Sequence, residues 1–466
     1  MDHASHKRTR LAKQLSLLEA LVWILAVVVA WWWILSATEQ ALQSAIYYAS
    51  VVSVLAGVRA FLGHGKNIIT ATGLYGLSTG MFIGYSGIIL AGQPTIDPPW
   101  YYLALASGAG LTAQIGTTLL AWRYTPTRVF PTHWFQARSA NWAVGAGLLM
   151  LGLAVALQLI VPDWQWWAEA SAFSAICVLT GGLMLRDKAR LLSISTVCIA
   201  ATVILYAEFF HAGTGRLLIV ALACAIAVIF AFRFQRLTLK IAIVLVIPLA
   251  LWWMAMDRLA LEQGISGAST AGRTGLESMV APLNVFALML EALHEHGFTP
   301  SYGYNLLSVP ALFIPESIWP NQPRALGYEV VRFDAPELYG DGIFSTVVSS
   351  TGEAIYNFGW WGLALIIVVA AIVLRLLDGF LLSRLSAQRL NVMGLLGLVF
   401  AAMLAGAIAD YTWSGVHTYA ARMIARLPAF LLIVTAAWLT TRIRFNLQPR
   451  RQHATHAKFR KRKIQD

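Results

Sequence analysis

Long runs of apolar residues, separated by short polar connections, recur along most of this chain. Many of them are about 20 residues long, the length at which an α-helix crosses a hydrocarbon layer about 30 Å thick. Helices suit that environment because they satisfy their own backbone polar groups without water. The pattern predicts about twelve spanning helices, the last two shorter and interrupted by Gly or Pro. Their predicted ranges are 17–36, 41–63, 67–92, 101–122, 141–161, 167–185, 191–210, 217–232, 241–256, 359–377, 392–409 and 424–440.

Composition leads to the same fold class. Apolar residues make up 58% of the chain and charged residues 12%, whereas a soluble domain has roughly 45–50% apolar residues. We therefore expect an all-α polytopic membrane protein. Cys177, Cys198 and Cys224 fall inside predicted spans, where a thiol behaves as a small buried hydrophobe. No disulfide and no metal-binding cysteine set is expected.

Lys and Arg alternate between successive connections. They precede the first span and return in every second loop, whereas the connections at 38–40, 93–100 and 163–165 carry neither. Because basic loops are retained in the cytoplasm, both termini are predicted to be cytoplasmic. The basic tail at 441–466 belongs there as well, against anionic lipid headgroups. This retention explains most of the net charge of +12, so nucleic acid is not an expected partner.

One connection is far longer than the others. Residues 257–358 separate an N-terminal bundle at 1–256, with about nine helices, from about three further spans at 359–440. The alternation of loops places this long connection on the outer, non-cytoplasmic side of the membrane. Within it, 277–296 predicts an amphipathic helix that lies on the membrane or caps the bundle. Its apolar face comprises Met279, Leu283, Phe286, Leu290 and Leu293.

Two segments of this loop have a distinctive sequence. Residues 310–323 contain four prolines, which exclude a long regular helix and predict an ordered irregular segment. Residues 349–360 read SSTGEAIYNFGW and lead into the next span. This segment places Glu353, Tyr356 and Asn357 at the outer mouth of the bundle.

These segments resemble the bacterial oligosaccharide repeat-unit polymerases, the Wzy or O-antigen polymerase family. The stretch 304–323 is similar to that family's aromatic and proline-rich segment, and the resemblance also rests on Gly352 and Glu353 followed by 356–360. The architecture is similar too, with a large late outer loop and a shorter, arginine-bearing outer loop upstream at 211–216. Glu316 departs from the basic residue that relatives carry, which weakens an anion-binding role at that position.

The resemblance implies a fold similar to the GT-C membrane glycosyltransferases, with an active site at the outer surface of the bacterial cytoplasmic membrane. It implies that a growing glycan on undecaprenyl pyrophosphate is transferred to the non-reducing-end hydroxyl of a fresh lipid-linked repeat unit. Lipid-linked oligosaccharides and membrane lipids are then the partners. A chain-length-regulating co-polymerase and a flippase are the candidate protein partners.

The pyrophosphate that leaves in this reaction develops charge that must be stabilised. Arg216 follows Gly213 and Gly215 immediately before an apolar run, which predicts a position near a helix N-terminus, where anions are favoured. Its guanidinium offers bidentate contacts to phosphate, although a snorkelling interfacial arginine is the alternative. The other outward arginines that would line an anionic-substrate cleft are Arg273, Arg324, Arg332 and Arg422.

The acceptor hydroxyl needs a base, and Glu353 and His417 are the candidates. An ion pair that only orders the loop is the alternative for each. Aromatic side chains stack on sugar rings, although they also anchor proteins at interfaces. The candidate sugar contacts are Tyr304, Trp319, Tyr356, Trp360 and Trp413, and Asn357 is a further candidate substrate contact.

Other functional classes share parts of this pattern. Asp410 and Glu208 are predicted to be buried carboxylates near outer helix ends, as a proton-coupled transporter or a lipid-linked oligosaccharide flippase would use. No repeat relates the two halves of the chain, as many transporters show. A ligase that moves finished glycan onto another acceptor would share carrier, fold and site. A non-catalytic export scaffold would not need several outward arginines.

Neither a cofactor nor a metal is expected. The outer loops contain no Asp-x-Asp pair, and no His/Cys ligand cluster stands out. His294 and His296 would point to different faces of a helix. The predicted chemistry is therefore metal-independent glycosyl transfer.

Overall fold

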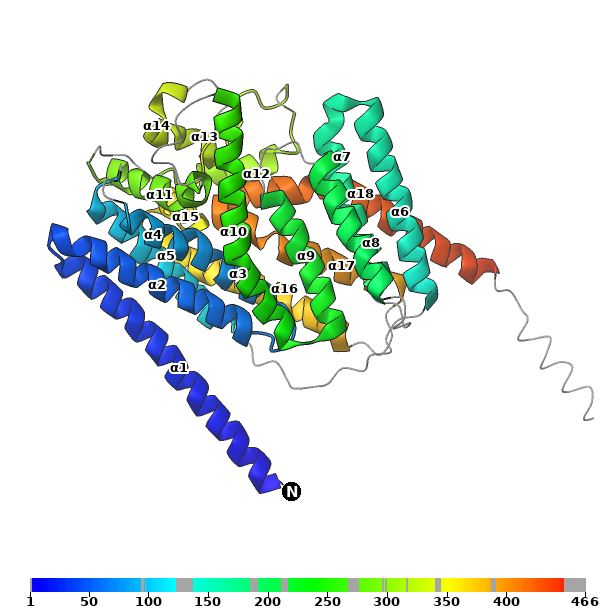
Figure 1. Cartoon of the computed structure of the whole chain (residues 1–466), viewed down its shortest axis with the longest axis horizontal. Helices are drawn as coiled ribbons and strands as arrows, with labels where there is room; N and C mark the ends of the chain where they lie inside the picture. Colours follow the sequence, from blue (N-terminus) through cyan, green and yellow to red (C-terminus); the bar gives the residue numbers. More distant parts are fainter. Residues whose placement is uncertain are drawn as a thin grey trace, which may run out of the picture. The chain divides into compact units, whose positions relative to one another are not determined.

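The computed structural model describes residues 2–93, 96, 98–122, 137–184, 192–210, 217–266, 276–295, 297, 300–315, 317–339, 345–386 and 391–447. Every regular element in these ranges is helical (Figure 1). The α-helices are α1 (Asp2–Ser36), α2 (Glu39–Gly63), α3 (Ala71–Thr79), α4 (Ser86–Ala91), α5 (Trp100–Ala121), α6 (Ala137–Ile160), α7 (Gln165–Met184), α8 (Leu192–Leu205), α9 (Leu217–Phe234), α10 (Leu237–Ser266), α11 (Glu277–Glu295), α12 (Ser308–Ala311), α13 (Leu326–Glu329), α14 (Val331–Asp334), α15 (Ser350–Phe358), α16 (Trp361–Ser386), α17 (Val392–Gly406) and α18 (Ile408–Leu447). Short π or 3-10 segments are η1 (Gly80–Tyr85), η2 (Pro162–Trp164), η4 (Tyr206–Phe210), η5 (Tyr304–Leu307) and η6 (Pro336–Leu338).

Ten helices in the described part of the chain are long and apolar enough to cross a membrane. Each overlaps a span predicted from the sequence. Two further apolar helices, Leu237–Ala250 and Val392–Gly406, are shorter. The chain is therefore an all-α polytopic membrane protein, and the count of twelve spans stays a prediction. The described cysteines all lie in helices and form no disulfide.

Helices extend into segments that the sequence predicted to be loops. α10 continues to Ser266, so the first described residues of the predicted outer loop are helical. α18 begins at Ile408, so the predicted connection at 410–423 is wrong as well. Residues 257–266 contain Arg, Leu, Ala, Glu and Gln, which favour helix. Residues 410–423 contain Tyr, Thr, Ser and Gly, which favour helix less, so contacts such as that between Asp410 and Arg422 must support the helix there. Residues 304–315 and 317–323 contain only the short helices η5 and α12, turns and irregular backbone, so no long helix forms there, as the prolines predicted.

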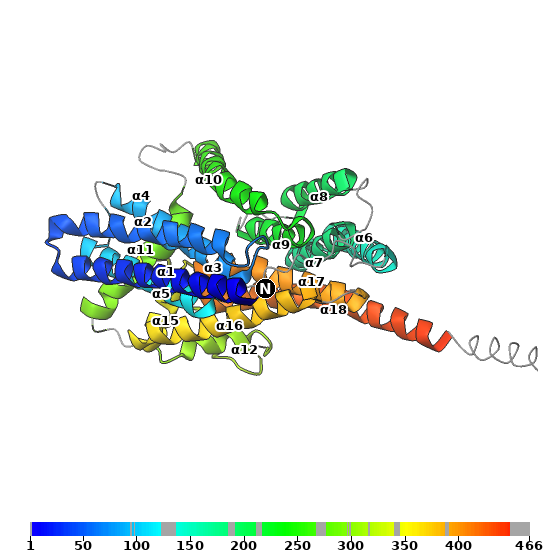
Figure 2. The same cartoon turned by 90° about the horizontal axis from the view of Figure 1, so that it is seen from below.

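The chain folds as two compact units. The first unit comprises residues 1–131, 213–386 and 401–423, and the second comprises 132–212, 387–400 and 424–466. In the first unit, α1, α2 and α5 pack beside one another (Figures 1 and 2).

Close approach of α2 and α3 forms the centre of the first unit. A methyl group at Gly76 would lie 2.7 Å from the Cβ atom of Ala60, so only glycine allows these two backbones to approach so closely. Gln114 of α5 links the pair, because its Nε2 donates to the carbonyl oxygens of Ser53 at 3.0 Å and Gly76 at 2.8 Å. The Ser53 hydroxyl donates in return to Gln114 Oε1 at 2.7 Å. This buried polar link fixes the register of three helices.

The predicted amphipathic helix at 277–296 corresponds to α11, which packs against α5, η1, α4, α14 and α15. Leu283, Phe286 and Met289 are fully buried. The predicted apolar face is confirmed, with Leu293 half-buried at its end. Because residues on neighbouring faces such as Val285 are buried too, α11 is an integral part of the first unit.

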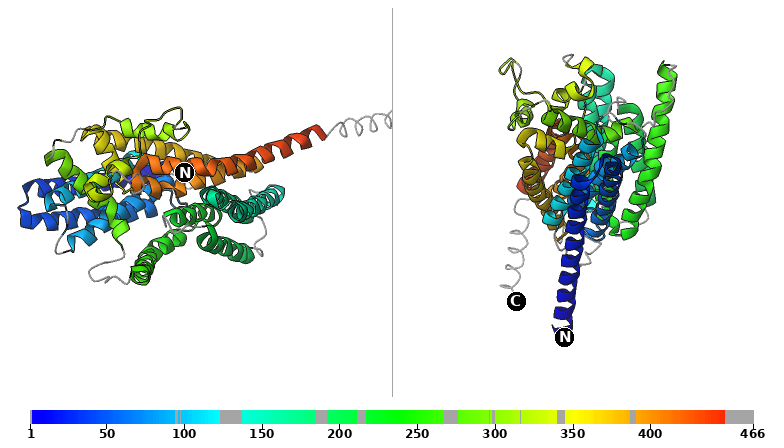
Figure 3. Two further views of the ribbon diagram at one scale, coloured as in Figure 1. Left: turned by 90° about the horizontal axis from the view of Figure 1, so that it is seen from above. Right: turned by 90° about the vertical axis from the view of Figure 1, so that its left-hand side faces the viewer.

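The second unit is built on the antiparallel pair α6 and α7 (Figure 3). A methyl group at Gly182 would lie 2.8 Å from the backbone nitrogen of Val144, so these helices also touch through small residues. The buried guanidinium of Arg426 stacks on the ring of Phe173 at 3.7 Å, and the Ser174 hydroxyl donates to the Arg426 carbonyl at 3.0 Å. The stacking of Arg426 on Phe173 and the hydrogen bond from Ser174 hold the C-terminal part of α18 to α7.

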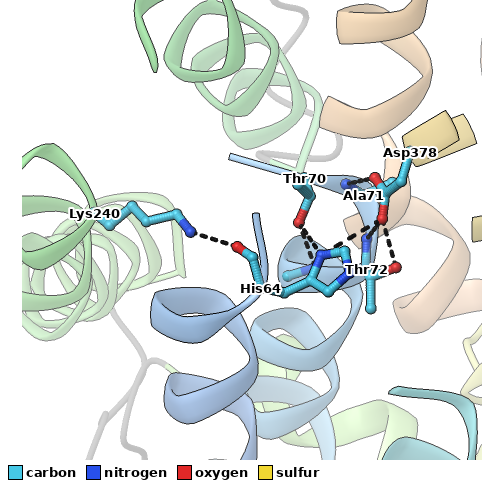
Figure 4. A network of polar contacts seen from close by, with 7 residues as sticks. His64, Thr70, Ala71, Thr72, Lys240 and Asp378 are labelled. Atoms are coloured by element: carbon cyan, nitrogen blue, oxygen red, sulfur yellow. Dashed lines mark hydrogen bonds and ion pairs between the residues drawn. The ribbon is translucent and has the colours of Figure 1, made fainter. Parts of the chain in front are cut away.

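A buried carboxylate joins α16 to the start of α3 (Figure 4). Asp378 Oδ1 accepts from the backbone N–H of Ala71 at 2.6 Å, and Oδ2 accepts from the Thr72 backbone at 3.1 Å and from its hydroxyl at 2.6 Å. The first turn of a helix has unsatisfied N–H groups and a positive dipole end. Asp378 satisfies both needs from a different helix, and sequence reasoning did not predict this role.

His64 and Lys240 extend this network. The His64 Nδ1 atom lies 2.7 Å from the Thr70 hydroxyl and 3.7 Å from Asp378 Oδ2. Burial, and secondly the nearby Lys240 charge, lowers the pKa of His64 to about 4, so its contact with Asp378 near neutral pH is a polar contact and not an ion pair. Lys240 Nζ donates to the His64 carbonyl at 2.7 Å. The network thus links α2, α3, α10 and α16.

Replacing Asp378 by alanine is expected to destabilise the protein by about 3 kcal/mol, because three donors at the start of α3 lose a charged partner inside the fold. Thermal unfolding of the purified protein in detergent would measure the change. Asp163→Ala, at an exposed aspartate of η2, is the matched control and should leave the midpoint unchanged. Equal midpoints for the two variants would contradict the structural role of Asp378.

Candidate active site at the break in α18

The site forms where α15 meets a break in α18. Ser349 precedes α15 and caps it, because its hydroxyl oxygen accepts from the Gly352 backbone N–H at 3.2 Å. α15 ends at Phe358, and the next residue, Gly359, has a positive φ of 60°. Glu353 lies in the first turn of this short helix and is only 3% exposed.

α18 is interrupted at Gly415, where φ is 82° and ψ is −164°. Non-glycine residues rarely adopt this conformation, and a side chain here would collide with the Glu353 carboxylate. The interruption releases the Val416 N–H from the helical pattern, in which it would bond to a carbonyl four residues earlier. This N–H donates to Glu353 Oε2 at 2.7 Å. Glycine is therefore required at position 415 by conformation and by space.

His417 lies one residue beyond this contact. Its Nδ1 atom is 2.8 Å from the Ser308 hydroxyl, and that hydroxyl donates to the Asn305 carbonyl at 2.6 Å. Because the Ser308 proton is used there, Ser308 Oγ accepts from His417 Nδ1–H. The neutral ring then has its lone pair on Nε2, as a proton acceptor requires.

An ion pair spans the break. Arg422 Nη1 donates to Asp410 Oδ1, and Asp410 is fully buried. In a straight helix these two residues would be about 18 Å apart along the axis, so the bend at Gly415 is what brings them together. Asp410 is buried, as predicted, whereas Glu208 of η4 is exposed, and the prediction of a buried carboxylate at Glu208 is wrong.

Two other predicted residues support α15. Asn357 is fully buried, where its Nδ2 donates to the Glu353 carbonyl at 2.8 Å and its Oδ1 accepts from the Ser301 hydroxyl at 2.6 Å. Tyr356 is buried, and its hydroxyl accepts from Arg332 at 2.8 Å. Burial is the main cause that raises the pKa of this tyrosine. Asn357 and Arg332 therefore position the loop and the helix in this structure.

The other predicted residues differ in burial or lie outside the described part of the chain. Tyr304 and Arg324 are exposed, and Trp319 is half-buried in the proline-rich segment. Arg216, Arg273 and Glu316 lie outside the described residues. Leu217, which follows Arg216 in the sequence, packs in a cluster with Ala409 and Trp413 at the start of α18.

Burial determines the proton affinity of Glu353. It raises the pKa of this carboxyl from 4.5 to about 7, and the hydrogen bond from Val416 opposes the shift. A carboxylate of this kind is half-ionised near neutral pH, the range in which general acid–base catalysts work best. The described residues contain no group of three or more His, Cys, Asp or Glu side chains arranged to hold a metal. The arrangement can therefore accept a proton from a hydroxyl at Glu353 or at His417.

No protein-family model, curated protein or solved structure matches this chain.

The Glu353 pKa predicts a pH-dependent stability difference. Because the folded-state pKa lies above the ordinary value of 4.5, the contribution of Glu353 is fully present below about pH 4.5 and is lost as the pH rises through about 7. Glu353→Gln keeps an acceptor for Val416 and never ionises. Relative to wild type, it should gain on the order of 3 kcal/mol between pH 4.5 and 7, measured by thermal unfolding in detergent.

The matched control is Glu337→Gln, at an exposed glutamate of η6. It is measured at the same pH values, so that the effect of exchanging any glutamate for glutamine can be subtracted. A pH-independent difference for Glu353→Gln would mean that the buried carboxyl is ionised throughout this range.

Proposed function

We propose that the chain polymerises lipid-linked oligosaccharide repeat units at the outer face of the bacterial cytoplasmic membrane, as a metal-independent glycosyltransferase. The observation that carries the proposal is the Glu353 carboxylate, buried and bound to the Val416 N–H at the break in α18. The resemblance of 304–323 and 352–360 to oligosaccharide polymerases supports it. So does the multi-pass membrane fold, which suits a substrate on a lipid carrier.

The reaction can be written with these residues. The acceptor is a sugar hydroxyl at the non-reducing end of a lipid-linked repeat unit, and the donor is the growing glycan on undecaprenyl pyrophosphate. Glu353 takes the hydroxyl proton as the new carbon–oxygen bond forms at the anomeric carbon. The bond from that carbon to the pyrophosphate oxygen breaks, and the carrier pyrophosphate leaves with the electron pair.

His417 and Arg216 complete the proposed roles. His417, held as the Nδ1–H tautomer by Ser308, has an acceptor nitrogen and is the second candidate base. Arg216 stabilises the leaving pyrophosphate, because a guanidinium binds phosphate oxygens in a bidentate manner. Arg422 is paired with Asp410, so it acts by holding the bend of α18 and not by direct phosphate contact.

The function predicts the products of inactive variants. In cells that carry Glu353→Gln or Arg216→Ala as their only copy, single repeat units should reach the acceptor or remain as lipid-linked monomers on the outer face. Electrophoresis of surface glycan and extraction of carrier lipid would measure this. Glu337→Gln should give full-length polymer, and the membrane should contain equal amounts of each protein.

The alternatives predict other products. Long polymer stranded on the carrier lipid would identify a ligase. Monomers trapped on the inner face would identify a flippase or transporter. Full-length polymer from Glu353→Gln cells would exclude this carboxylate from the reaction.

A further inference from the structure

A groove on the first unit has no residue of α18 in its described lining. It has a volume of about 500 Å³ and is lined by side chains of α1, α5, α11 and α15 and by the residues that follow α15. Most of the lining is apolar or aromatic, and it includes Trp31, Leu35, Leu105, Leu290, Ile355 and Trp360. We call it the aromatic groove.

Several tryptophan and tyrosine side chains gather at the aromatic groove. Trp31 and Trp360 meet edge to face with ring centres 6.1 Å apart, and Tyr101 contacts Tyr102 in the same way at 5.4 Å. Trp361, beside them in sequence, is 84% exposed. Such residues gather where the hydrocarbon layer meets the headgroups. An occupant here would therefore have an apolar chain and a polar head.

Tyr102 and His294 form the polar end of the aromatic groove, and two acidic side chains that do not line it lie next to Tyr102. The Tyr102 hydroxyl donates to Glu295 Oε1 at 3.0 Å and lies 2.7 Å from His294 Nδ1. Because that hydroxyl proton is used toward Glu295, its oxygen accepts from the His294 Nδ1–H. Glu291 lies close enough to Tyr102 to interact with it electrostatically. Among the described residues that line the groove, none is Lys or Arg.

We propose that the aromatic groove binds a bilayer phospholipid whose headgroup carries a primary amine, with an acyl chain along Leu35, Leu105 and Leu290 and the ammonium group at Glu295. An ammonium with N–H donors complements a carboxylate. An anionic lipid places net negative charge beside the same carboxylate and is disfavoured. A lipid pyrophosphate is disfavoured for the same reason, so this site is separate from the carrier site of the proposed polymerase and does not depend on that function.

The occupant would also contact the helix that carries Glu353. Ile355 and Gly359 of the α15 segment line the aromatic groove, and Ile355 is about 200° around the helix from Glu353. The lipid and the buried carboxylate therefore lie against different faces of one short helix. This places the lipid where it can stabilise α15 without entering the site.

Lipid retention by the purified full chain tests the proposal. The protein in detergent is incubated with equal amounts of dioleoyl phosphatidylethanolamine, phosphatidylcholine and phosphatidylglycerol, and the lipid retained after gel filtration is measured by mass spectrometry. About fivefold more phosphatidylethanolamine than phosphatidylglycerol should be retained. Phosphatidylcholine, whose ammonium has no N–H, should fall between them.

Matched variants separate the headgroup contact from the chain contact. Glu295→Gln should remove the preference for phosphatidylethanolamine, whereas Glu39→Gln, at an exposed glutamate of α2, should keep it. Leu35→Trp fills the groove from exposed α1 and should lower retention of all three lipids, whereas Leu25→Trp, at an exposed leucine elsewhere on α1, should not.

Three results would overturn the proposal. Equal retention of phosphatidylethanolamine and phosphatidylglycerol would show that the carboxylate does not select the headgroup. An unchanged preference for phosphatidylethanolamine in Glu295→Gln would show that Glu295 does not bind the amine. A doubled protein mass that Leu35→Trp abolishes would show that a second copy of the chain, and not a lipid, covers the aromatic groove.

Discussion

A helix that crosses a membrane normally uses all of its backbone N–H groups internally, so a site that binds a backbone N–H in the middle of such a helix requires a break in the pattern. Gly415 provides that break in α18, and its positive φ excludes other residues. The released Val416 N–H binds Glu353, and the bend brings Arg422 to Asp410. His417 is held beside the break by Ser308. The glutamate, the histidine and the ion pair therefore all depend on one glycine.

The packing of the first unit determines where this break meets α15. Glycine contacts between α2 and α3 and the Gln114 hydrogen bonds fix the central helices. Asp378 then ties α16 to the start of α3 through charged hydrogen bonds. Since α15 leads into α16 across Gly359, a fixed α16 limits the positions that α15 can take. The buried Asp378 network and the Glu353 site are thus connected through two consecutive helices.

The sequence predicted the fold class and much of the helix pattern, because apolar runs of about 20 residues have few other solutions. It identified Glu353 and His417 as candidates, since both lie in polar segments near predicted helix ends. The sequence placed His417 and Arg422 in a loop, however, because the residues at 410–417 are too polar to indicate a spanning helix. In the structure these residues are helical, and contacts with distant segments such as Glu353 and Ser308 satisfy them. Asp378 was missed for the same reason: its donors, Ala71 and Thr72, are far away in sequence. Gly415 can be read from the sequence, but the sequence does not show why a glycine is needed there. The reason is its contact with the Glu353 carboxylate in the folded protein.

The central claim is that Glu353 accepts the proton of a sugar hydroxyl. The most direct test is the rate of glycan transfer by the purified protein, measured with the proposed substrate, a lipid-linked repeat unit, between about pH 5 and 8. Burial raises the pKa of Glu353 to about 7, and only the ionised form can act as a base. The wild-type rate should therefore rise with pH and level off above about 7, whereas Glu353→Gln should be slow and lack this rise. A wild-type rate that does not change with pH, or an equal rise in Glu353→Gln, would contradict the account.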